Sequence, residues 1–387
     1  MMQTTITARG AKRIRHGHLW VYRSDVVAAD EAQAGAIVRV VDPANNFVGQ
    51  ALYSDSSEIA LRFLTTRDET IDRDWWRHRL RACAERRASI ARQTNAYRLI
   101  YSEGDLLPSL IVDRYDDVLV MQTLSQGTDR LKGEICELLV EQLQPRAVIE
   151  RNDARVRQFE GLESKTGVIY GEAPGQIEIN QHGVSFFVAP LGGQKTGAFL
   201  DQRENYLAAA RVAHGRALDC FTFNGGFALH IAQSCDEVVG IDISEDAIAA
   251  AKRNAELNER RDVEFRALNV FDALRDFESA DETFDTIILD PPAFAKNRAS
   301  VKSAMRGYKE INLRALKLLR ANGVLISCSC SYHMQPEMFL EIIREAALDA
   351  HRRVQIVEVR GQSSDHPVLL GVPETHYLKC VIARVIE

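Results

Sequence analysis

Residues 218–229, "LDCFTFNGGFAL", decide the fold, because they join a buried strand to a helix through a turn of small residues. The strand "RALDCF" leads into the turn Asn224-Gly225-Gly226, and a helix is expected from about residue 225. Small residues in such a turn let the backbone approach a ligand closely, and a helix N-terminus offers unpaired amides. A Gly-Gly turn is also compatible with a purely structural role. Whether this turn binds a ligand therefore has to be judged from the rest of the chain.

Strands and helices alternate regularly from about residue 216 onward. Strands are expected at "RALDCF", "EVVGIDI", "VEFRALNV", "FDTIILD" and "GVLISCS", helices from about 225 and over 245–258, 301–321 and 336–349, and late strands near 354–358 and 376–385. This alternation predicts an α/β fold with a doubly wound, Rossmann-like parallel sheet. In that fold the ligand lies at the carboxyl ends of the strands.

The chain before residue 185 follows a different pattern. Short strand-like runs over 35–66 are separated by Gly and Asn and predict a small barrel-like module. Further strand-length runs occupy 97–124, and a helical pattern over about 127–143 precedes the strand candidates "RAVIERN" and "VIYGEA". We therefore expect a β module, a central α+β domain and the α/β domain, with divisions near residues 70 and 185.

The composition is that of an ordinary soluble protein, with 46% hydrophobic and 26% charged residues among 387. No apolar run has the length of a membrane span, and the N-terminus lacks the apolar centre of a signal peptide. The seven cysteines are widely spread and include no C-x-x-C pair, which argues against a disulfide framework. We expect a cytoplasmic protein without a metal site or a membrane partner.

A helix expected over residues 73–92 carries seven arginines against Asp74 and Glu85, although the whole chain has a net charge of −6. Apolar residues at positions 76, 80, 83, 84 and 88 give this segment a helical stripe. A solvated charged face and a face that contacts RNA phosphates both fit the pattern.

Asp242 indicates a nucleoside cofactor, because it ends the next strand, where a carboxylate can accept both ribose hydroxyls. NAD and S-adenosyl-L-methionine both suit that geometry, but "FNGGFA" lacks the G-x-G-x-x-G spacing of a pyrophosphate cradle. Asp219 can also accept the ammonium of S-adenosyl-L-methionine, which favours a class I methyltransferase domain. Asn269 suits the adenine amino group, beside an apolar wall that includes Val270. The predicted cofactor-binding residues of this domain are Asp219, Phe221, Asn224, Gly225, Asp242, Ile243, Asn269, Val270 and Asp290.

The stretch "FDTIILDPPAFAK" (284–296) indicates that a nucleobase is the methyl acceptor. Its buried run delivers Asp290 to the sheet edge, and Pro291-Pro292 hold the chain extended without amide donors. An exocyclic amine acceptor is usually served by an aromatic residue directly after the second proline. Here Ala293 occupies that place.

Carbon-5 of cytosine requires a nucleophile, because it reacts only after a thiolate has added to carbon-6. The stretch "GVLISCSCSY" (323–332) places two cysteines at the end of a strand. Cys330 lies nearer the open end of the site, at the carboxyl end of the strand, and is the predicted nucleophile. Cys328 lies deeper and is the better core residue. Alternatively both are inert packing, because free cysteines are often buried. A reactive thiol needs a nearby positive charge, for which Arg203 and Lys296 are the candidates.

Five motifs together resemble the bacterial ribosomal RNA large subunit methyltransferase I family, and the resemblance covers nearly the whole chain. They are "GAKRIRHGHLWVYRSDV" (10–26), "YSEGDLLPSLIVDRY" (101–115), "LGGQKTGAFLDQREN" (191–205), "LDPPAFAK" (289–296) and "SCS" (329–331). The resemblance implies a PUA domain (1–70), a central α+β domain (71–185) and a methyltransferase domain (186–387). It further implies a homodimer that methylates carbon-5 of a cytosine in large-subunit ribosomal RNA.

The resemblance also implies roles for individual residues. Cys330 matches the nucleophile of the family's S-C-S motif, and Asp290 matches the carboxylate that holds the cytosine edge. Thr196, Phe199 and Arg203 fall in the block that closes over the cofactor.

Two positions depart from the family pattern: Gln194-Lys195 reverses the usual Lys-Gln order, and Cys328 stands where an aromatic is common. Two other functions stay open. One is an amino-group methyltransferase of adenine or guanine in RNA, and the other is an RNA-binding protein that has kept the fold without catalysis.

Overall fold

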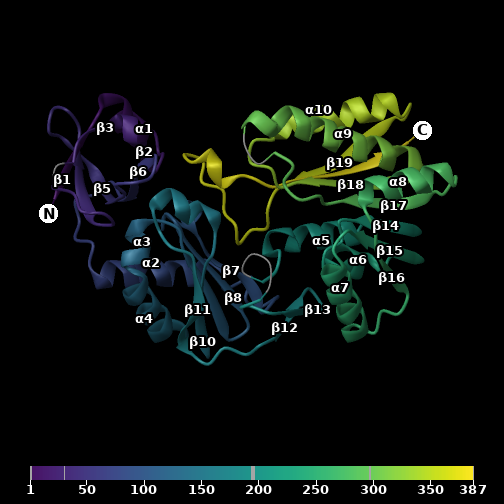
Figure 1. Cartoon of the computed structure of the whole chain (residues 1–387), viewed down its shortest axis with the longest axis horizontal. Coiled ribbons are helices and arrows are strands. Elements are labelled where there is room, and N and C mark those ends of the chain that lie inside the picture. Colours follow the sequence, from purple (N-terminus) through teal and green to yellow (C-terminus); the bar gives the residue numbers. More distant parts are fainter. Residues whose placement is uncertain (1, 30, 193–196, 296–297, 387) are drawn as a thin grey trace. The chain divides into compact units, whose positions relative to one another are not determined.

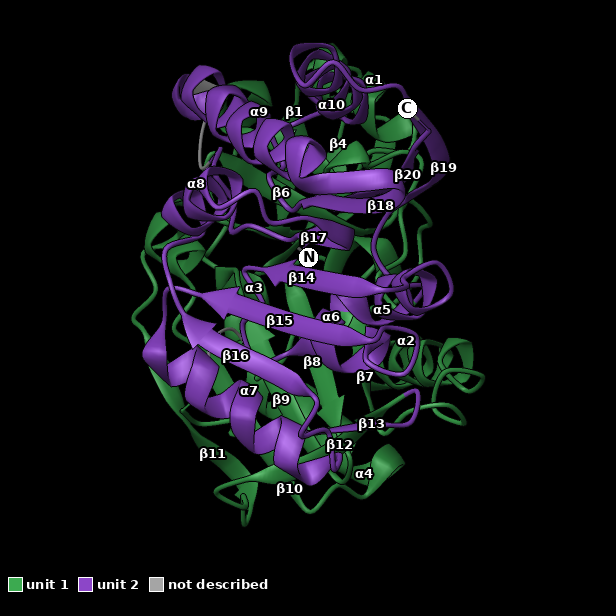
Figure 2. Ribbon diagram, turned by 90° about the vertical axis from the view of Figure 1, so that its right-hand side faces the viewer, with its two compact units in different colours: residues 1–181, 188–200, 365–375 green, residues 182–187, 201–364, 376–387 purple. Residues whose placement is uncertain are grey.

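A computed structural model describes residues 2–29, 31–192, 197–295 and 298–386 of the chain (Figure 1). Its internal contacts divide the chain into two compact units (Figure 2). Unit 1 comprises residues 1–181, 188–200 and 365–375, and unit 2 comprises residues 182–187, 201–364 and 376–387. The strands β12 (Ile177–Gln181) and β13 (Val184–Val188) lie where the chain passes from one unit to the other.

Unit 2 contains the alternating fold that the sequence predicts. Its strands are β14 (Arg216–Cys220), β15 (Glu237–Asp242), β16 (Val263–Ala267), β17 (Phe284–Leu289), β18 (Leu319–Ser329), β19 (Val354–Arg360) and β20 (Lys379–Val385). They form one sheet in the order β16-β15-β14-β17-β18-β20-β19 (Figure 2). The sheet is not wholly parallel as predicted, because β20 inserts between β18 and β19 and runs antiparallel to both.

The described part of unit 2 holds six helices beside this sheet: α5 (Arg203–Ala210), α6 (Gly226–Ile231), α7 (Glu245–Leu257), α8 (Val270–Ser279), α9 (Val301–Leu318) and α10 (Pro336–Asp349). Apolar side chains of α8, α9 and α10 share one buried core with alternate residues of the strands. The sequence interpretation missed α8, because it extended the strand "VEFRALNV" through Val270. The strand ends at Ala267, and the Asn269 side chain caps α8.

The first part of unit 1 is the predicted β module. Its elements are β1 (Gln3–Ile6), α1 (Ala8–Arg15), β2 (Trp20–Tyr22), β3 (Val26–Ala28), β4 (Ile37–Val41), β5 (Phe47–Tyr53) and β6 (Ile59–Thr65). The strands form one sheet in the order β2-β6-β5-β4-β1-β3 (Figure 1). The alternating runs of 35–66 supply β4, β5 and β6, whose apolar side chains line the module's core.

The second part of unit 1 is α+β, as predicted. It consists of α2 (Arg73–Arg86), β7 (Ala96–Tyr101), β8 (Leu110–Tyr115), β9 (Val118–Thr123), α3 (Gln126–Arg130), α4 (Lys132–Leu143), β10 (Ala147–Asn152) and β11 (Lys165–Gly171). The sheet order is β11-β10-β9-β8-β7. Only β9 and β10 pair in parallel, since α3 and α4 form the crossover that a parallel connection needs. Among the described residues no helix is long and apolar enough to cross a membrane.

The arginine-rich helix α2 ends at Arg86, and its apolar stripe is buried at Trp76, Leu80 and Cys83. Four of the seven arginines are tied to acidic neighbours within unit 1. Arg73 and Arg77 each pair with Glu141, and Arg86 and Arg87 each pair with Asp105. These ion pairs favour a structural role for those four side chains.

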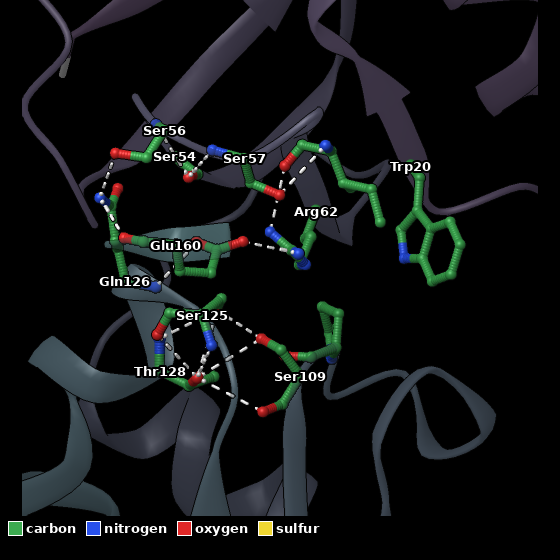
Figure 3. A network of polar contacts seen from close by, with 12 residues as sticks. Trp20, Ser54, Ser56, Ser57, Arg62, Ser109, Ser125, Gln126, Thr128 and Glu160 are labelled. Carbon is green, nitrogen blue, oxygen red and sulfur yellow. Dashed lines mark hydrogen bonds and ion pairs between the residues drawn. The ribbon is translucent and has the colours of Figure 1, made fainter. Parts of the chain in front are cut away.

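A buried polar network joins the two parts of unit 1 (Figure 3). Arg62 of β6 forms an ion pair with Glu160 at 2.8 Å, and the two side chains are 7% and 0% exposed. Gln126 at the start of α3 donates to the Asp55 carboxylate and to the Glu160 carbonyl. A charged pair this deeply buried requires both members, because removal of one leaves an uncompensated charge.

Replacement of Arg62 with Met should therefore destabilise unit 1 by about 3–5 kcal/mol. The three tryptophans of the chain, Trp20, Trp75 and Trp76, all lie in unit 1. Urea unfolding followed by tryptophan fluorescence thus reports the stability of this unit.

The matched control is Arg39→Met, because the partner of Arg39, Asp68, has a side chain that is 64% exposed. Loss of such a surface pair should cost about 1 kcal/mol or less. A destabilisation by Arg62→Met no larger than that of the control would contradict this account of the network.

Candidate active site

The loop after β14 is a strained turn that requires small residues. Phe221, Phe223 and Gly225 have positive φ angles of 64°, 50° and 89°. Two phenylalanines in that region are costly, so the surrounding structure imposes the shape of the turn. Gly226 is needed for a different reason: a Cβ there would lie 2.6 Å from the hydroxyl of Tyr206. Gly226 is thus required by its packing against Tyr206, whereas close approach of this loop to the cofactor stays a prediction.

Asp219 at the end of β14 is a buried carboxylate. One of its oxygens accepts hydrogen bonds from the Thr222 hydroxyl at 2.6 Å and the Ala228 amide at 3.0 Å. The other oxygen is buried and has no hydrogen-bond partner among the described residues. Burial raises the pKa of Asp219 to about 7, although those two hydrogen bonds act in the opposite direction. An unpartnered buried carboxylate oxygen fits the ammonium of S-adenosyl-L-methionine.

Asp242 ends β15, and its carboxylate is held by two backbone amides. Phe223 donates to it at 3.1 Å and Ser244 at 2.9 Å. A carboxylate accepts about four hydrogen bonds, so capacity for two ribose hydroxyls is left. The next side chain, Ile243, is 70% exposed and offers an apolar surface to an adenine ring. Asn224 is half-buried in the same loop, and its carbonyl accepts from Asn254 at 3.0 Å.

Asn269 and Val270 both make contacts within the fold. The Asn269 side-chain oxygen accepts from the Phe271 amide at 2.9 Å and thereby caps α8. Val270 is only 3% exposed and belongs to the core. Contact of these two residues with adenine stays a prediction.

Asp290 follows β17 and is held by a buried hydrogen-bond chain. Gln202 donates to its carboxylate at 3.0 Å. The side-chain oxygen of Gln202 in turn accepts a hydrogen bond from the Asn205 side-chain amide at 2.7 Å. The side-chain oxygen of Asn205 accepts one from the Arg360 guanidinium at 2.8 Å. Gln202 was not predicted. Its place beside Arg203 in "FLDQREN" was the signal that could have indicated it.

Cys330 lies one residue beyond β18 and is half-buried. Its Sγ is 3.9 Å from the carbonyl oxygen of Pro291. The hydroxyls of Ser329 and Ser331 each form a hydrogen bond of 3.0 Å with the Tyr308 hydroxyl. Because both neighbours turn toward Tyr308, Cys330 faces the other side, where the Asp-Pro-Pro segment lies.

Cys328 lies in the core, in agreement with the prediction for this residue. It is fully buried, and in the β18–β20 register it lies opposite Cys380. Burial raises the pKa of its thiol well above the ordinary value. A thiol in such surroundings is inert toward a substrate.

A buried lysine near the end of β18, Lys379, was not predicted from the sequence. Lys379 begins β20, and its ammonium donates to the carbonyls of Ser331 and Tyr377, each at 2.7 Å. Lys379 and Ser331 are far apart in the sequence and make contact because β20 inserts beside β18. No local pattern could have revealed this contact.

For the remaining predicted residues, a place at the site stays a prediction. Arg203, expected near the thiol, lies beside Glu204 and His182, each at 3.4 Å. Phe199 belongs to unit 1. Thr196, Lys296 and the reversed pair Gln194-Lys195 lie outside the described residues.

Comparison with known proteins places this site in a family. Family models match a PUA-like domain at residues 5–66 and a methyltransferase domain at residues 212–365. The ribosomal RNA large subunit methyltransferase I of Tolumonas auensis is 41% identical over 97% of both chains, and that of Shewanella frigidimarina is 38% identical over 97% of both. The chain belongs to the ribosomal RNA large subunit methyltransferase I family. The crystal structure of SMU.776 complexed with SAH shares its fold, with a TM-score of 0.87 over 100% of both chains at 20% identity.

Membership of the ribosomal RNA large subunit methyltransferase I family confirms the predicted resemblance, the PUA-like module and the class I methyltransferase fold. It also confirms S-adenosyl-L-methionine, rather than a dinucleotide, as the cofactor. The lining of the site agrees, because the unpartnered oxygen of Asp219 and the carboxylate of Asp242 fit the two polar ends of that molecule.

Asp219→Asn should stabilise the ligand-free protein at pH 8 and weaken the binding of S-adenosylhomocysteine. The carboxyl pKa is about 7 in the folded protein against an ordinary value of 3.8, so between these values the folded protein binds the extra proton. The free energy of unfolding therefore falls as the pH rises through this window. Thermal unfolding at several pH values should show that slope in the wild type and its loss in the variant, and calorimetry should show the weaker binding.

The exposed residue Asp276 of α8 provides the control, since Asp276→Asn should change neither the slope nor the affinity. Equal pH slopes for the wild type and Asp219→Asn would contradict the burial of a charge at this position.

Proposed function

We propose that this protein is an S-adenosyl-L-methionine-dependent methyltransferase that forms 5-methylcytosine in large-subunit ribosomal RNA through a covalent adduct with Cys330. One observation carries the proposal: the half-buried thiol lies 3.9 Å from the carbonyl oxygen of Pro291, in the segment that begins with Asp290. A nucleophile and a carboxylate that can bind the edge of a base thus share one rim of the sheet.

The chemistry requires the protein to activate carbon-5 of the base. The thiolate of Cys330 forms a bond to carbon-6, and the electron pair of the carbon-5 to carbon-6 double bond moves toward ring nitrogen 3, which takes up a proton. Asp290, oriented by Gln202, hydrogen-bonds this edge of the base and favours that protonation. When bound, S-adenosyl-L-methionine supplies an electrophilic methyl group. Carbon-5 takes the methyl group, and loss of its proton to a base then supplies the electron pair that restores the carbon-5 to carbon-6 double bond. The bond from carbon-6 to sulfur breaks with its electron pair and restores the thiolate, and ring nitrogen 3 gives up the proton that it had taken.

The names of the relatives and the PUA-like module support RNA as the substrate. A base must leave its stack to reach a sheet rim, which costs a few kcal/mol in a duplex and less in a loop. Unpaired or protein-free ribosomal RNA is therefore the easier substrate. The proposal includes a cytoplasmic homodimer, the domain limits 1–70, 71–185 and 186–387, and closure of Thr196, Phe199 and Arg203 over the cofactor.

The aromatic residue nearest the Asp-Pro-Pro segment gives less support to an amino-group methyltransferase. Phe294 packs among Tyr308, Phe271 and Phe221, with ring centroids 4.7, 6.1 and 6.4 Å away. A ring packed in this cluster has less of its surface available to stack on a base, although Phe294 is only partly buried.

Covalent trapping tests the proposal. Large-subunit ribosomal RNA transcribed with 5-fluorocytidine, incubated with the protein and S-adenosyl-L-methionine, should give an adduct that survives a denaturing gel, because fluorine cannot leave as the proton does. Cys330→Ala should abolish the adduct, and the matched variant Cys328→Ala should retain it.

Three other results of the trapping and methyl-transfer measurements would contradict the proposal. An adduct that persists in Cys330→Ala would refute the assignment of the nucleophile. Methyl transfer that survives both substitutions would indicate an amino-group acceptor, and RNA binding without transfer would indicate a non-catalytic protein.

A further inference from the structure

Tyr206 of α5 is a buried tyrosine whose ring is fixed by its neighbours. The residue is only 6% exposed. Between ring centroids, it lies 4.7 Å from Phe227 and 4.9 Å from His230, both of α6. His230 in turn stacks on Phe186 at 5.8 Å, and all four residues belong to unit 2. A ring held in this way leaves only the O–H bond free to rotate, so the fold sets the position of the hydroxyl oxygen.

The hydroxyl of Tyr206 lies against the strand-to-helix turn that follows β14. A Cβ on Gly226 would lie 2.6 Å from it, so the hydroxyl closely approaches the backbone of that residue. Two residues further on, the Ala228 amide donates to the Asp219 carboxylate at 3.0 Å. The hydroxyl and this carboxylate therefore border the same short turn, at the edge of the sheet where a ligand of this fold binds.

This hydroxyl is a hydrogen-bond donor that the fold itself does not use. It forms no hydrogen bond within the described ranges. Several side-chain atoms of the described residues are sealed from solvent without a partner, but this hydroxyl is not one of them, so a ligand can reach it. Burial raises the pKa of Tyr206 well above its ordinary value, and the charge of Asp290 acts in the same direction. The hydroxyl therefore keeps its proton at neutral pH.

The amino-acid end of S-adenosyl-L-methionine offers the matching acceptor. Its ammonium and its carboxylate are bonded to one carbon atom, so the two groups are always close together. The unpartnered oxygen of Asp219 fits the ammonium, and a donor that borders the same turn is therefore suited to the carboxylate. The charges of Asp219 and Asp290 oppose a further anion here, and a hydrogen bond from a neutral donor offsets part of that repulsion.

We propose that the Tyr206 hydroxyl donates a hydrogen bond to the carboxylate of the cofactor's amino-acid end, and that it thereby selects ligands that carry this group. The contact requires a donor at the position that the ring contacts fix, which phenylalanine cannot supply. The inference concerns cofactor binding alone. It does not depend on Cys330 or on which base is methylated.

Three ligands that differ at this end test the proposal by isothermal titration calorimetry with the full-length protein. S-adenosylhomocysteine carries both groups, S-adenosyl-3-thiopropylamine lacks the carboxylate, and 5′-methylthioadenosine lacks both. Tyr206→Phe should weaken the binding of S-adenosylhomocysteine about tenfold or more, because a hydrogen bond to a charged group is lost. Its dissociation constants for the two other ligands should stay near the wild-type values.

Two further variants serve as controls. Tyr308→Phe removes another hydroxyl of unit 2, which bonds Ser329 and Ser331, and should leave all three affinities unchanged. Asp219→Asn should weaken S-adenosylhomocysteine and S-adenosyl-3-thiopropylamine alike, because both carry the ammonium. The two patterns of loss thus assign the two polar groups of the ligand to two residues.

The proposal is overturned if Tyr206→Phe binds S-adenosylhomocysteine as the wild type does. An equal loss for all three ligands would assign the hydroxyl to the shape of the turn, and an equal loss for the two ligands with an ammonium would assign it to that group. Either result refutes the carboxylate contact. So does a wild-type protein that binds S-adenosylhomocysteine no better than S-adenosyl-3-thiopropylamine, a comparison that needs no variant to fold.

Steady-state methyl transfer gives a second readout. The amino-acid end does not react, so the contact stabilises the bound ground state and the transition state equally. Tyr206→Phe should therefore raise KM for S-adenosyl-L-methionine about tenfold and leave kcat near the wild-type value. A lower kcat with an unchanged KM would contradict the inference. Calorimetry needs no RNA, so the outcome of the trapping experiment with Cys330→Ala leaves this test intact, and the two proposals can fail separately.

Discussion

The parallel pairing of β14, β15, β17 and β18 is the constraint on which the site depends. Because these strands run in one direction, their carboxyl ends meet at one edge of the sheet, and the residues placed there are brought together. Asp219 and Asp242 thereby share an edge with Asp290 and Cys330, although they are widely separated in the sequence. The antiparallel strand β20 adds Lys379 to this edge from the opposite direction.

Two ionisable groups near this edge of the sheet, Asp219 and Lys379, are buried. The Asp219 carboxylate and the Lys379 ammonium are both almost inaccessible to solvent, and burial shifts the pKa of each toward its neutral form. Both shifts lower the stability of the ligand-free protein near neutral pH. The cofactor ammonium is the proposed partner of the Asp219 carboxylate. For Asp219, the proposed cofactor contact offsets this loss of stability when the cofactor binds.

The sequence predicted the groups whose positions follow from local patterns and missed those set by tertiary contacts. Apolar strands that end in an acidic residue revealed β14, β15 and β17, and with them Asp219 and Asp242. The helix α8 was missed because the predicted strand was continued to Val270, although the Asn269 that precedes it is a capping signal. Lys379 could not be foreseen, because only the insertion of β20 brings it to β18. Gln202 lies beside a predicted residue, but its bond to Asp290 depends on the packing of α5.

The central claim is that the sulfur of Cys330 becomes covalently bound to the base, and peptide mapping of the trapped complex tests it most directly. After digestion with protease and nuclease, the account predicts that a methylated fluoropyrimidine nucleotide is attached to the peptide of residues 321–344, with fragmentation that assigns it to Cys330. Attachment to any other residue of the chain, or an unmodified Cys330 in an RNA complex that has transferred its methyl group, would contradict the account.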